Sequence, residues 1–147
     1  MRWPWFRRNR LASVQTADEV LRRGRRMAAN APYMFPIDVE ENSRLDLQHY
    51  LLRYVLRGNF VAPIRHPTSI LDIGCGTGRW AAEMARQFPR AAVTGVDIVP
   101  PTITSASVVQ GGISPPNCRF LEGDVTKGLP FATGSFDFVH MRLVVLA

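Results

Sequence analysis

The residues of this sequence whose types and spacing point to chemistry lie in one short stretch, ILDIGCGTGRW, at residues 70–80. A short apolar run that contains Asp72 is followed by three glycines at alternate positions, Gly74, Gly76 and Gly78. Where a strand turns through glycines into a helix, the backbone can approach a ligand closely, and amide N–H groups can face an anion. We expect a ligand-binding loop here, in which a side chain at any of the three glycines would hold the ligand away.

The spacing of the glycines separates two classes of ligand. Dinucleotide-binding loops follow the pattern G-x-G-x-x-G, in which the third glycine packs the helix against the strand. In this sequence the third glycine comes one residue earlier, and Arg79 stands at the dinucleotide position. An acid two residues before the first glycine completes the pattern D-x-G-x-G-x-G, which favours S-adenosylmethionine over NAD.

Further polar residues end the apolar runs that follow. Asp97 ends the second run, where a carboxylate can accept hydrogen bonds from ribose hydroxyls. Asp124 follows the third run, placed to accept from the exocyclic amine of an adenine, and His140 ends the fourth, near the reactive sulfur end of such a ligand. Each acid alone is more often a helix cap or a turn residue, but together they lie where open α/β sheets bind ligands. We interpret Asp137 as a solvent-facing strand or turn residue.

The elements that must position these residues alternate between strand and helix patterns. A helix is expected from Arg79 to Phe88, with Trp80 and Met84 on its core side. Residues 100–112 predict a weak helix, and RLVVLA at residues 142–147 predicts the first turns of another. This alternation predicts an α/β fold with a Rossmann-like, doubly wound parallel sheet and right-handed crossovers. The expected strands are SILDIG, AAVTGVDI, CRFLEGD and FDFVHM.

Helical patterns also precede the glycine loop. The sequence from Glu40 to Arg57 predicts an amphipathic helix that is closed by Gly58. Upstream, TADE has the pattern of a capping box, and EVLRRGRRMAAN after it predicts a short basic helix, which Gly24 weakens by up to ~1 kcal/mol. The expected apolar side of the longer helix consists of Leu45, Leu52 and Leu56, with Gln48, Leu51 and Val55.

The positive charge of the chain lies in its first 30 residues. They contain eight arginines against Asp18 and Glu19, a net charge of +6, whereas the other 117 residues hold ten basic and ten acidic groups. Such a basic leader suits contact with nucleic acid or an anionic membrane surface, or it is a solvated extension that is partly disordered or a short helix. We favour the solvated extension and do not expect a nucleic-acid partner.

The cysteines and the apolar runs indicate the compartment. Cys75 and Cys118 are too few for a disulfide framework and form no C-x-x-C pair, so we expect reduced thiols and a cytoplasmic protein without a metal site. No apolar run approaches the ~20 residues of a membrane-spanning helix. The N-terminus lacks the apolar core of a secretory signal, and a mitochondrial-type presequence is an alternative that we disfavour.

Two long stretches of the sequence resemble a known family. ILDIGCGTGRWAAEMARQFPRAAVTGVDIVPP, followed by NCRFLEGDVTKGLPFATGSFDFVHMR, resembles the class I S-adenosylmethionine-dependent methyltransferases. The stretch YMFPIDVEENSRLDLQHYLLRYVLRGNFVAPI is similar to the subgroup that contains fungal secondary-metabolism regulators and their bacterial relatives, which carry an R-L-D-x-Q-H helix. The resemblance covers about residues 32–146.

The resemblance implies roles for individual residues in binding S-adenosylmethionine. Asp97 corresponds to the ribose-binding acid, with Ile98 against the adenine, and Asp124 with Val125 corresponds to the adenine-edge pair. His140 corresponds to a position that lines the methionine end, more often through its backbone than as a base, so we assign no catalytic residue. The loop around the methionine part of the cofactor would consist of Asp72, Gly74, Cys75, Gly76 and Gly78.

The element ahead of the glycine loop lies over the cofactor in this family, and Tyr33, Arg44 and His49 fall in it. We hypothesise that Arg44 or Tyr33 contacts the carboxylate of the cofactor. The alternative is that Arg44 pairs along its own helix, with Glu40, Glu41 or Gln48.

The resemblance also implies a domain organisation. Residues 1–30 form the basic leader, 31–66 a helical lid element, and 67–147 the cofactor-binding core. Because the family has seven strands and only four are expected here, we expect the N-terminal, cofactor-binding half of the fold with little of the substrate site. The fourth strand would then be an open edge through which the chain could associate with itself or another chain.

These expectations leave several functions open. A methyltransferase that acts on a small molecule is favoured, with a protein side chain or a lipid as other acceptors. An inactive cofactor-binding module that associates with another chain is the main alternative. An NAD-dependent oxidoreductase is disfavoured by the glycine spacing, and nucleic-acid binding through the leader is the remaining possibility.

Overall fold

A computed structural model describes residues 19–22, 25–28, 38–99, 101 and 114–144 of the chain. Tyr33 and the first 18 residues lie outside this part, as does the weak helix expected at residues 100–112, except for Pro101.

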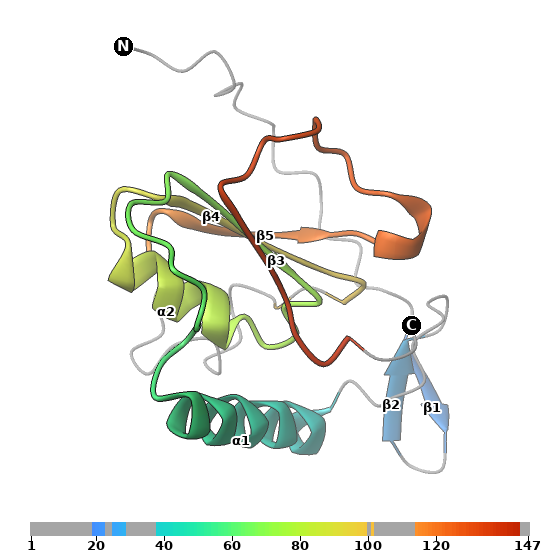
Figure 1. Cartoon of the computed structure of the whole chain (residues 1–147). Coiled ribbons are helices and arrows are strands. Elements are labelled where there is room, and N and C mark those ends of the chain that lie inside the picture. The colour runs from blue at the N-terminus through green and yellow to red at the C-terminus, as the bar shows by residue number, and fades with distance from the viewer. Residues whose placement is uncertain (1–18, 23–24, 29–37, 100, 102–113, 145–147) are drawn as a thin grey trace.

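The centre of the protein is a four-stranded parallel sheet with the order β5-β4-β3-β6 (Figure 1). The order reverses at β3, because β4 and β5 lie on one side of it and β6 lies on the other. A reversal of this kind opens a crevice at the carboxyl ends of the strands. The predicted Rossmann-like α/β fold is thereby confirmed, with strands β3 (Ser69–Ile73), β4 (Ala92–Asp97), β5 (Cys118–Glu122) and β6 (Phe138–Met141).

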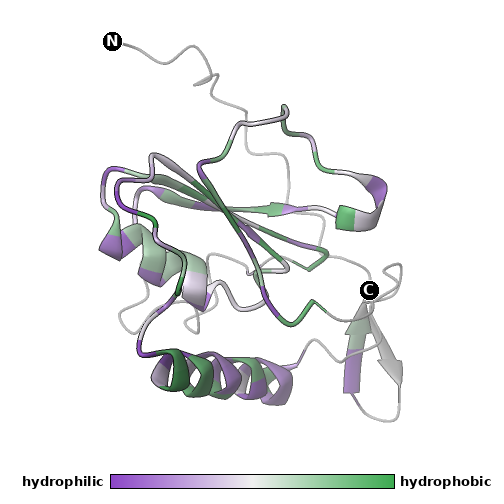
Figure 2. Ribbon diagram, viewed as in Figure 1, coloured by the Kyte–Doolittle hydropathy of each residue, from purple (hydrophilic) through white to green (hydrophobic). Residues whose placement is uncertain are grey.

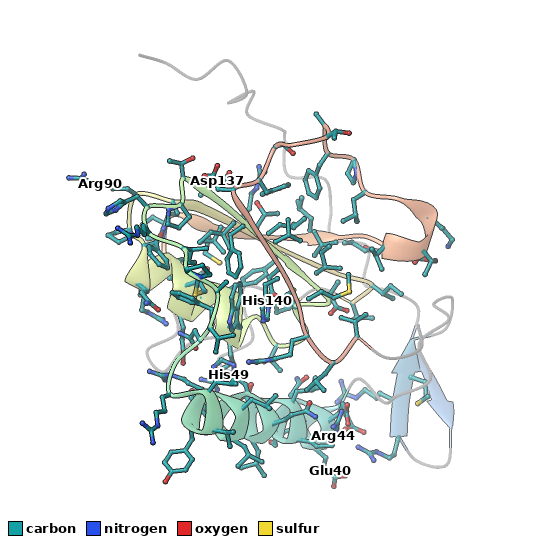
Figure 3. All side chains as sticks on the ribbon, viewed as in Figure 1. Glu40, Arg44, His49, Arg90, Asp137 and His140 are labelled. Carbon is teal, nitrogen blue, oxygen red and sulfur yellow. The ribbon has the colours of Figure 1, made fainter. Side chains whose placement is uncertain are left out.

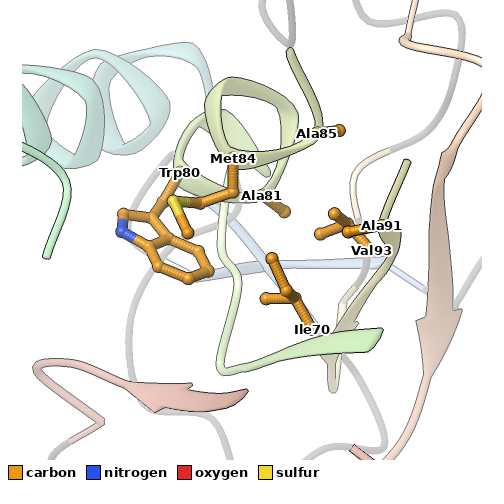
Figure 4. Close-up of a cluster of buried hydrophobic side chains, with 7 residues drawn as sticks. All are labelled: Ile70, Trp80, Ala81, Met84, Ala85, Ala91 and Val93. Atoms are coloured by element: carbon orange, nitrogen blue, oxygen red, sulfur yellow. The ribbon is translucent and has the colours of Figure 1, made fainter. Parts of the chain in front are cut away.

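Helix α2 (Arg79–Gln87) packs on one face of the sheet and completes the main core. Trp80 and Met84 of α2 lie over Ile70 of β3 and Val93 of β4, and all four side chains are buried (Figure 4). The predicted core side of this helix is therefore confirmed. The indole Nε1 of Trp80 donates a buried 2.7 Å hydrogen bond to the carbonyl of Asn59, which ties the chain ahead of β3 to the helix.

The other face of the sheet is covered by the segment between β5 and β6. Leu71 and Ile73 of β3, with Val96 of β4, pack there against half-buried apolar side chains that include Phe131 and Phe136. This segment contains the short 3₁₀ helix η1 (Val125–Lys127). Because β3 is buried on both faces, its sequence reads as a continuous apolar run rather than as an alternating one.

Helix α1 (Val39–Leu56) confirms the long helix expected ahead of the glycine loop. Its N-cap is Asp38, whose carboxylate accepts a 3.0 Å hydrogen bond from the amide of Glu41. The helix ends at Leu56 and is followed by Arg57 in the left-handed conformation, whereas the sequence predicted that Gly58 closes the helix. Arg57 thus acts as the C-cap, and its amide donates back to the last turn.

The expected apolar core side of α1 is only partly right, because Leu45, Gln48 and Leu52 are half-buried while the other three residues are exposed. Glu41 and His49 are its buried residues, whereas Leu51 and Val55 are 59% and 65% exposed. Figure 2 shows that the C-terminal half of the helix is rich in apolar residues although it lies at the surface. The reason is that α1 packs on the glycine loop and α2 through hydrogen bonds and ion pairs, so polar residues occupy its inner side.

The basic helix expected after the capping-box pattern is wrong. Strands β1 (Glu19–Arg22) and β2 (Arg25–Ala28) form an antiparallel hairpin in which Arg22 pairs with Arg25. Two residues separate these partners, and one of them is Gly24, which weakens a helix but suits a short hairpin connection. Arg25 also donates from two nitrogens to the carboxylate of Asp38, both at 2.7 Å, which links the hairpin to the start of α1.

The helix expected from residue 142 does not form in residues 142–144, where Leu143 has a positive φ of 57°. A left-handed residue cannot continue a right-handed helix. Within the part of the chain that the structure describes, no helix has the length and apolar character needed to cross a membrane.

Candidate functional site

A cavity of about 350 Å³ lies at the carboxyl ends of β3 and β4. This volume is within the range of about 300–1,000 Å³ that is typical of small-molecule sites. Its walls come from α1, the glycine loop, the end of β4 and the segment after β6. The lining residues include Arg44, Leu45, His49, Gly74, Cys75, Gly76, Trp80, Asp97, Ile98, Gly123, Val125 and Arg142.

The three glycines of the loop all have positive φ, at 68°, 53° and 75° for Gly74, Gly76 and Gly78, so the turn itself requires glycine. Their surroundings differ. Gly74 and Gly76 line the cavity, whereas Gly78 caps the start of α2, and a Cβ there would lie 2.6 Å from the ring of Phe120. The expectation that all three glycines make room for a ligand is therefore corrected for Gly78, which allows close packing of helix on sheet.

Four backbone amides of the loop donate hydrogen bonds inside the protein, which corrects for these four the expectation that they face an anion. A pyrophosphate-binding loop needs such amides free to donate to phosphate oxygens. The internal use of four of them disfavours a dinucleotide. The amides of Gly74 and Cys75 donate to the carbonyl of Val96, that of Gly76 to Asp97 Oδ2, and that of Gly78 to the carbonyl of Cys75, at 2.8–3.1 Å.

Asp97 is the acid that the structure places at the cavity. Its Oδ2 accepts from the amide of Gly76 at 2.8 Å, and its Oδ1 accepts from the amide of Val99 at 3.1 Å. Burial raises the pKa of this carboxyl group, and the hydrogen bonds from backbone amides oppose that shift. Since a carboxylate has about four acceptor positions, Asp97 retains capacity to accept from a ligand hydroxyl.

Asp72 and His140 meet behind the cavity wall and are not among the residues that line it. Asp72 is 2% exposed, and its Oδ1 lies 2.7 Å from Nδ1 of His140. The imidazole stacks on the indole of Trp80, with ring centroids 3.7 Å apart and an interplanar angle of 6°. Burial raises the pKa of Asp72, and His140 opposes that shift. Trp80, which lines the cavity, therefore contacts this pair through His140.

Asp124 has the role of a cap in this structure. Its Oδ1 accepts from the amide and the hydroxyl of Thr126, at 3.0 and 2.6 Å, and its Oδ2 lies 3.1 Å from Nζ of Lys127. These contacts, the hydrogen bond from the Thr126 hydroxyl first, lower the pKa of Asp124. Asp124 does not line the cavity, although its neighbours Gly123 and Val125 do.

Arg44 lines the cavity and also pairs along its own helix, as the alternative interpretation proposed. Its Nη2 and Nε lie 2.5 and 2.9 Å from the two carboxylate oxygens of Glu41. The guanidinium side chain is 51% exposed. Figure 3 shows His49 on the side of α1 that faces the sheet and Glu40 on the opposite side.

Asp46 was not predicted as a site residue, although it is the acid of the R-L-D-L-Q-H stretch. Its Oδ1 accepts a 2.7 Å hydrogen bond from the hydroxyl of Thr77, and its Oδ2 lies 2.8 Å from Nη2 of Arg79. The same turn of α1 places Leu45 opposite Gly76, 3.5 Å from where a Cβ of that glycine would lie. One carboxylate thus fastens α1 to the glycine loop and to the first turn of α2.

Arg142 was not predicted either. Its Nη2 lies 3.0 Å from Nδ1 of His49, and the Nε2 of the same histidine lies 3.4 Å from Glu83 of α2. The predicted residue His49 therefore connects α1 to two other walls of the site. Arg142 follows the fourth strand directly, so its position two residues after His140 in the sequence was the available signal.

Comparisons with known proteins identify the family. The family described as a methyltransferase domain matches residues 70–147. Methyltransferase str2 of Strobilurus tenacellus is 35% identical over 120 residues, which are 80% of this chain and 40% of that protein.

Two further relatives match a similar part of the chain. The secondary metabolism regulator laeA of Aspergillus fumigatus is 38% identical over 116 residues, 76% of this chain and 28% of that protein. The protein-methionine methyltransferase laeA of Emericella nidulans is 36% identical over 115 residues, with the same coverage of 76% and 28%. The chain therefore spans less than half the length of each of these relatives.

Proposed function

The chain belongs to the methyltransferase-domain family, in the class I group that includes the laeA proteins, and on that premise we propose that its cavity binds S-adenosylmethionine for methyl transfer to an acceptor. The observation that carries the proposal is the glycine loop. It lines a cavity at the reversal point of the sheet, its amides are used internally, and Asp97 stands beside it.

The residues around the cavity fit this cofactor. Asp97 supplies a carboxylate that suits ribose hydroxyls, and Ile98 and Val125 supply apolar surface that suits a flat base. Gly74, Cys75 and Gly76 would leave room for the amino-acid portion along the loop. We propose that Asp72, Gly78, Asp124 and His140 support these residues from behind the wall.

When bound, S-adenosylmethionine supplies a methyl group on a sulfonium, which is a good leaving group. The protein then mainly has to hold the partners in line and keep water out. Helix α1 serves both tasks, because Asp46 fastens it to the loop and Leu45 lies over Gly76. No side chain of the described site is assigned as a general base.

We propose a small molecule as the methyl acceptor. A protein side chain is the second choice. The Emericella nidulans relative is named a protein-methionine methyltransferase, which describes that protein. Incubation of the protein with S-adenosylmethionine carrying a labelled methyl group, together with fractionated small molecules or proteins, distinguishes the two acceptors.

Calorimetric titration tests the cofactor. We expect S-adenosylmethionine and S-adenosylhomocysteine to bind with one-to-one stoichiometry, and NAD and NADH not to bind. Binding of NADH in preference to both adenosyl compounds would contradict the proposal.

A second candidate is a cofactor-binding module that associates with another strand through β6. Among the described strands, β6 pairs only with β3, and its Val139 and Met141 are 52% and 53% exposed. A free strand edge is a template for pairing with another chain. Light scattering over a concentration series tests this function; a monomer at all concentrations, without and with S-adenosylhomocysteine, would exclude self-association.

A further inference from the structure

Arg142 is a cation in the wall of the cavity whose hydrogen bonds are incomplete. Its Nη2 contacts Nδ1 of His49 at 3.0 Å. Its Nη1 is buried and has no hydrogen-bond partner among the residues that the structure describes. A buried donor without a partner is unfavourable, and more so when it belongs to a charged group.

No carboxylate is left within the described structure to neutralise this guanidinium directly. Burial lowers the pKa of Arg142, and the charges of Asp72 and Glu83 oppose that shift. Neither carboxylate forms an ion pair with Arg142: Asp72 binds His140, and Glu83 lies 3.2 Å from Arg53 and 3.4 Å from His49. The charge of Arg142 therefore interacts electrostatically with these two acids, but forms no ion pair with either.

The other arginines that line the cavity differ from Arg142 in this respect. Arg44 pairs with Glu41, and Arg79 pairs with Asp46. An anionic ligand in the cavity would have to compete with those carboxylates for either guanidinium. Arg142 has no such competitor among the described residues.

His49 fixes the orientation of Arg142. Because a guanidinium only donates hydrogen bonds, Nδ1 of His49 has to accept, and the proton of the neutral imidazole is on Nε2, toward Glu83. This arrangement uses Nη2 and leaves Nη1 for another acceptor. A carboxylate is the acceptor that a guanidinium matches best, with two parallel hydrogen bonds.

We propose that Arg142 binds the carboxylate of the amino-acid portion of S-adenosylmethionine and that His49 is its positioning residue. The inference rests on the proposed function and deepens it. Arg142 lines the same cavity as Gly74 and Gly76, along which that portion of the cofactor is proposed to lie. It replaces the expectation that Arg44 or Tyr33 makes this contact.

Paired ligands test the inference by calorimetry. S-adenosylhomocysteine carries the amino-acid carboxylate, and 5′-methylthioadenosine lacks it but keeps the adenosine portion. Arg142→Gln should weaken binding of S-adenosylhomocysteine by about ten-fold or more, the typical effect of removing a hydrogen bond to a charged group. The same variant should bind 5′-methylthioadenosine as the unchanged protein does.

Two further variants keep the result interpretable. Arg142→Lys retains the positive charge but cannot form the bidentate hydrogen bonds of a guanidinium. It should therefore bind S-adenosylhomocysteine more tightly than Arg142→Gln and less tightly than the unchanged protein. Arg119→Gln is the matched control, because Arg119, like Arg142, donates to a neutral acceptor, in this case Oγ1 of Thr94 at 3.0 Å, but does not line the cavity. It should leave the affinity for both ligands unchanged.

Each other result overturns a defined statement. If Arg142→Gln lost affinity for both ligands equally, or lost none for S-adenosylhomocysteine, the proposed role of Arg142 would be overturned. The proposed function would not be affected by either result. Failure of the unchanged protein to bind either ligand would overturn the proposed function, and the inference with it.

Discussion

Asp72 of β3 and His140 of β6 are direct partners in the parallel register of the sheet, and their side chains meet at 2.7 Å. The carboxylate is almost fully buried, so this contact determines whether its charge is tolerated. Three side chains, one each from β3, β6 and α2, are linked through this pair and the stacking of His140 on Trp80.

His140→Phe should destabilise the protein in a pH-dependent way. Phenylalanine can still stack on Trp80, but Asp72 then has no partner from β6, and loss of one member of a buried pair costs about 3–5 kcal/mol. Burial already raises the pKa of Asp72, and removal of His140 takes away the largest interaction that opposes that shift. A raised carboxyl pKa gives stability that is present at low pH and lost as the pH rises through the folded-state pKa.

Urea unfolding of His140→Phe should therefore show the largest loss, relative to the unchanged protein, at neutral pH and a smaller loss near the acid end. The double variant Asp72→Asn, His140→Phe lacks the carboxylate and should lose this pH dependence. An equal loss at all pH values in the single variant would contradict the assignment.

Gly78→Ala should lower the free energy of unfolding through two effects. The residue has a φ of 75°, which strains alanine by about 1–3 kcal/mol. Its Cβ would meet the ring of Phe120, and that ring is also close to Gly95, so it cannot move aside; such overpacking costs about 1–3 kcal/mol more.

The control for this variant is Gly134→Ala. Gly134 has a φ of 73°, close to that of Gly78, but nothing lies within 4 Å of its added Cβ, so only the backbone strain should remain. Chemical denaturation of both variants measures the difference. Equal losses would show that close packing at Phe120 contributes nothing.

The contact between the hairpin and α1 should be lost in acid. The hydrogen bond from Arg25, and next the amide of Glu41, lower the pKa of Asp38 to about 2. A lowered carboxyl pKa gives stability that is present above the unfolded-state value of 3.8 and lost as the pH falls through about 2. Asp38→Asn should remove the part of the acid sensitivity between these values, as measured by unfolding from pH 5 downward.

Both cysteines should react slowly with thiol reagents in the folded protein. Burial raises the pKa of Cys75 well above its ordinary value and that of Cys118 to about 11. Since the thiolate is the reactive form, labelling with a disulfide reagent at pH 8 should follow unfolding and reach two thiols in denaturant. Rapid labelling of one thiol in native protein would contradict the burial of these side chains.

Asp97→Asn should reduce the affinity for S-adenosylhomocysteine by about ten-fold or more, as expected when a hydrogen bond to a charged acceptor is lost. An amide also places a donor opposite the Gly76 or Val99 amide, so the loop itself should shift. The matched control is Asp137→Asn. Asp137 likewise accepts from backbone amides, at Thr68 and Ser69, but at the amino end of β3 and outside the cavity.

Calorimetry measures the affinity of these two variants for the ligand, and thermal unfolding measures their stability. Together they distinguish loss of a direct contact with the cofactor from a general loss of stability. Asp137→Asn should be less stable than the unchanged protein but bind the ligand equally well. A similar loss of affinity in both variants would mean that Asp97 stabilises the fold and does not contact the ligand.

The sequence by itself determined the parts of the protein that depend on local pattern. The strands around Ile70 and Val93, the helix that carries Trp80 and the fourth strand with His140 were all predicted, because buried parallel strands and an amphipathic helix have distinctive periods. The glycine spacing predicted the family and the turn, since a left-handed backbone at these positions requires glycine.

The tertiary structure alone decided which polar groups meet. Asp46 with Arg79 and His49 with Arg142 are pairs of residues that lie far apart in the sequence, and no local pattern encodes their contact. The side of α1 that is buried was predicted only in part, for the same reason. Periodicity shows that apolar residues share a side of a helix, but the surface that covers the helix decides which side is inside, and here that surface offers ion pairs and hydrogen bonds.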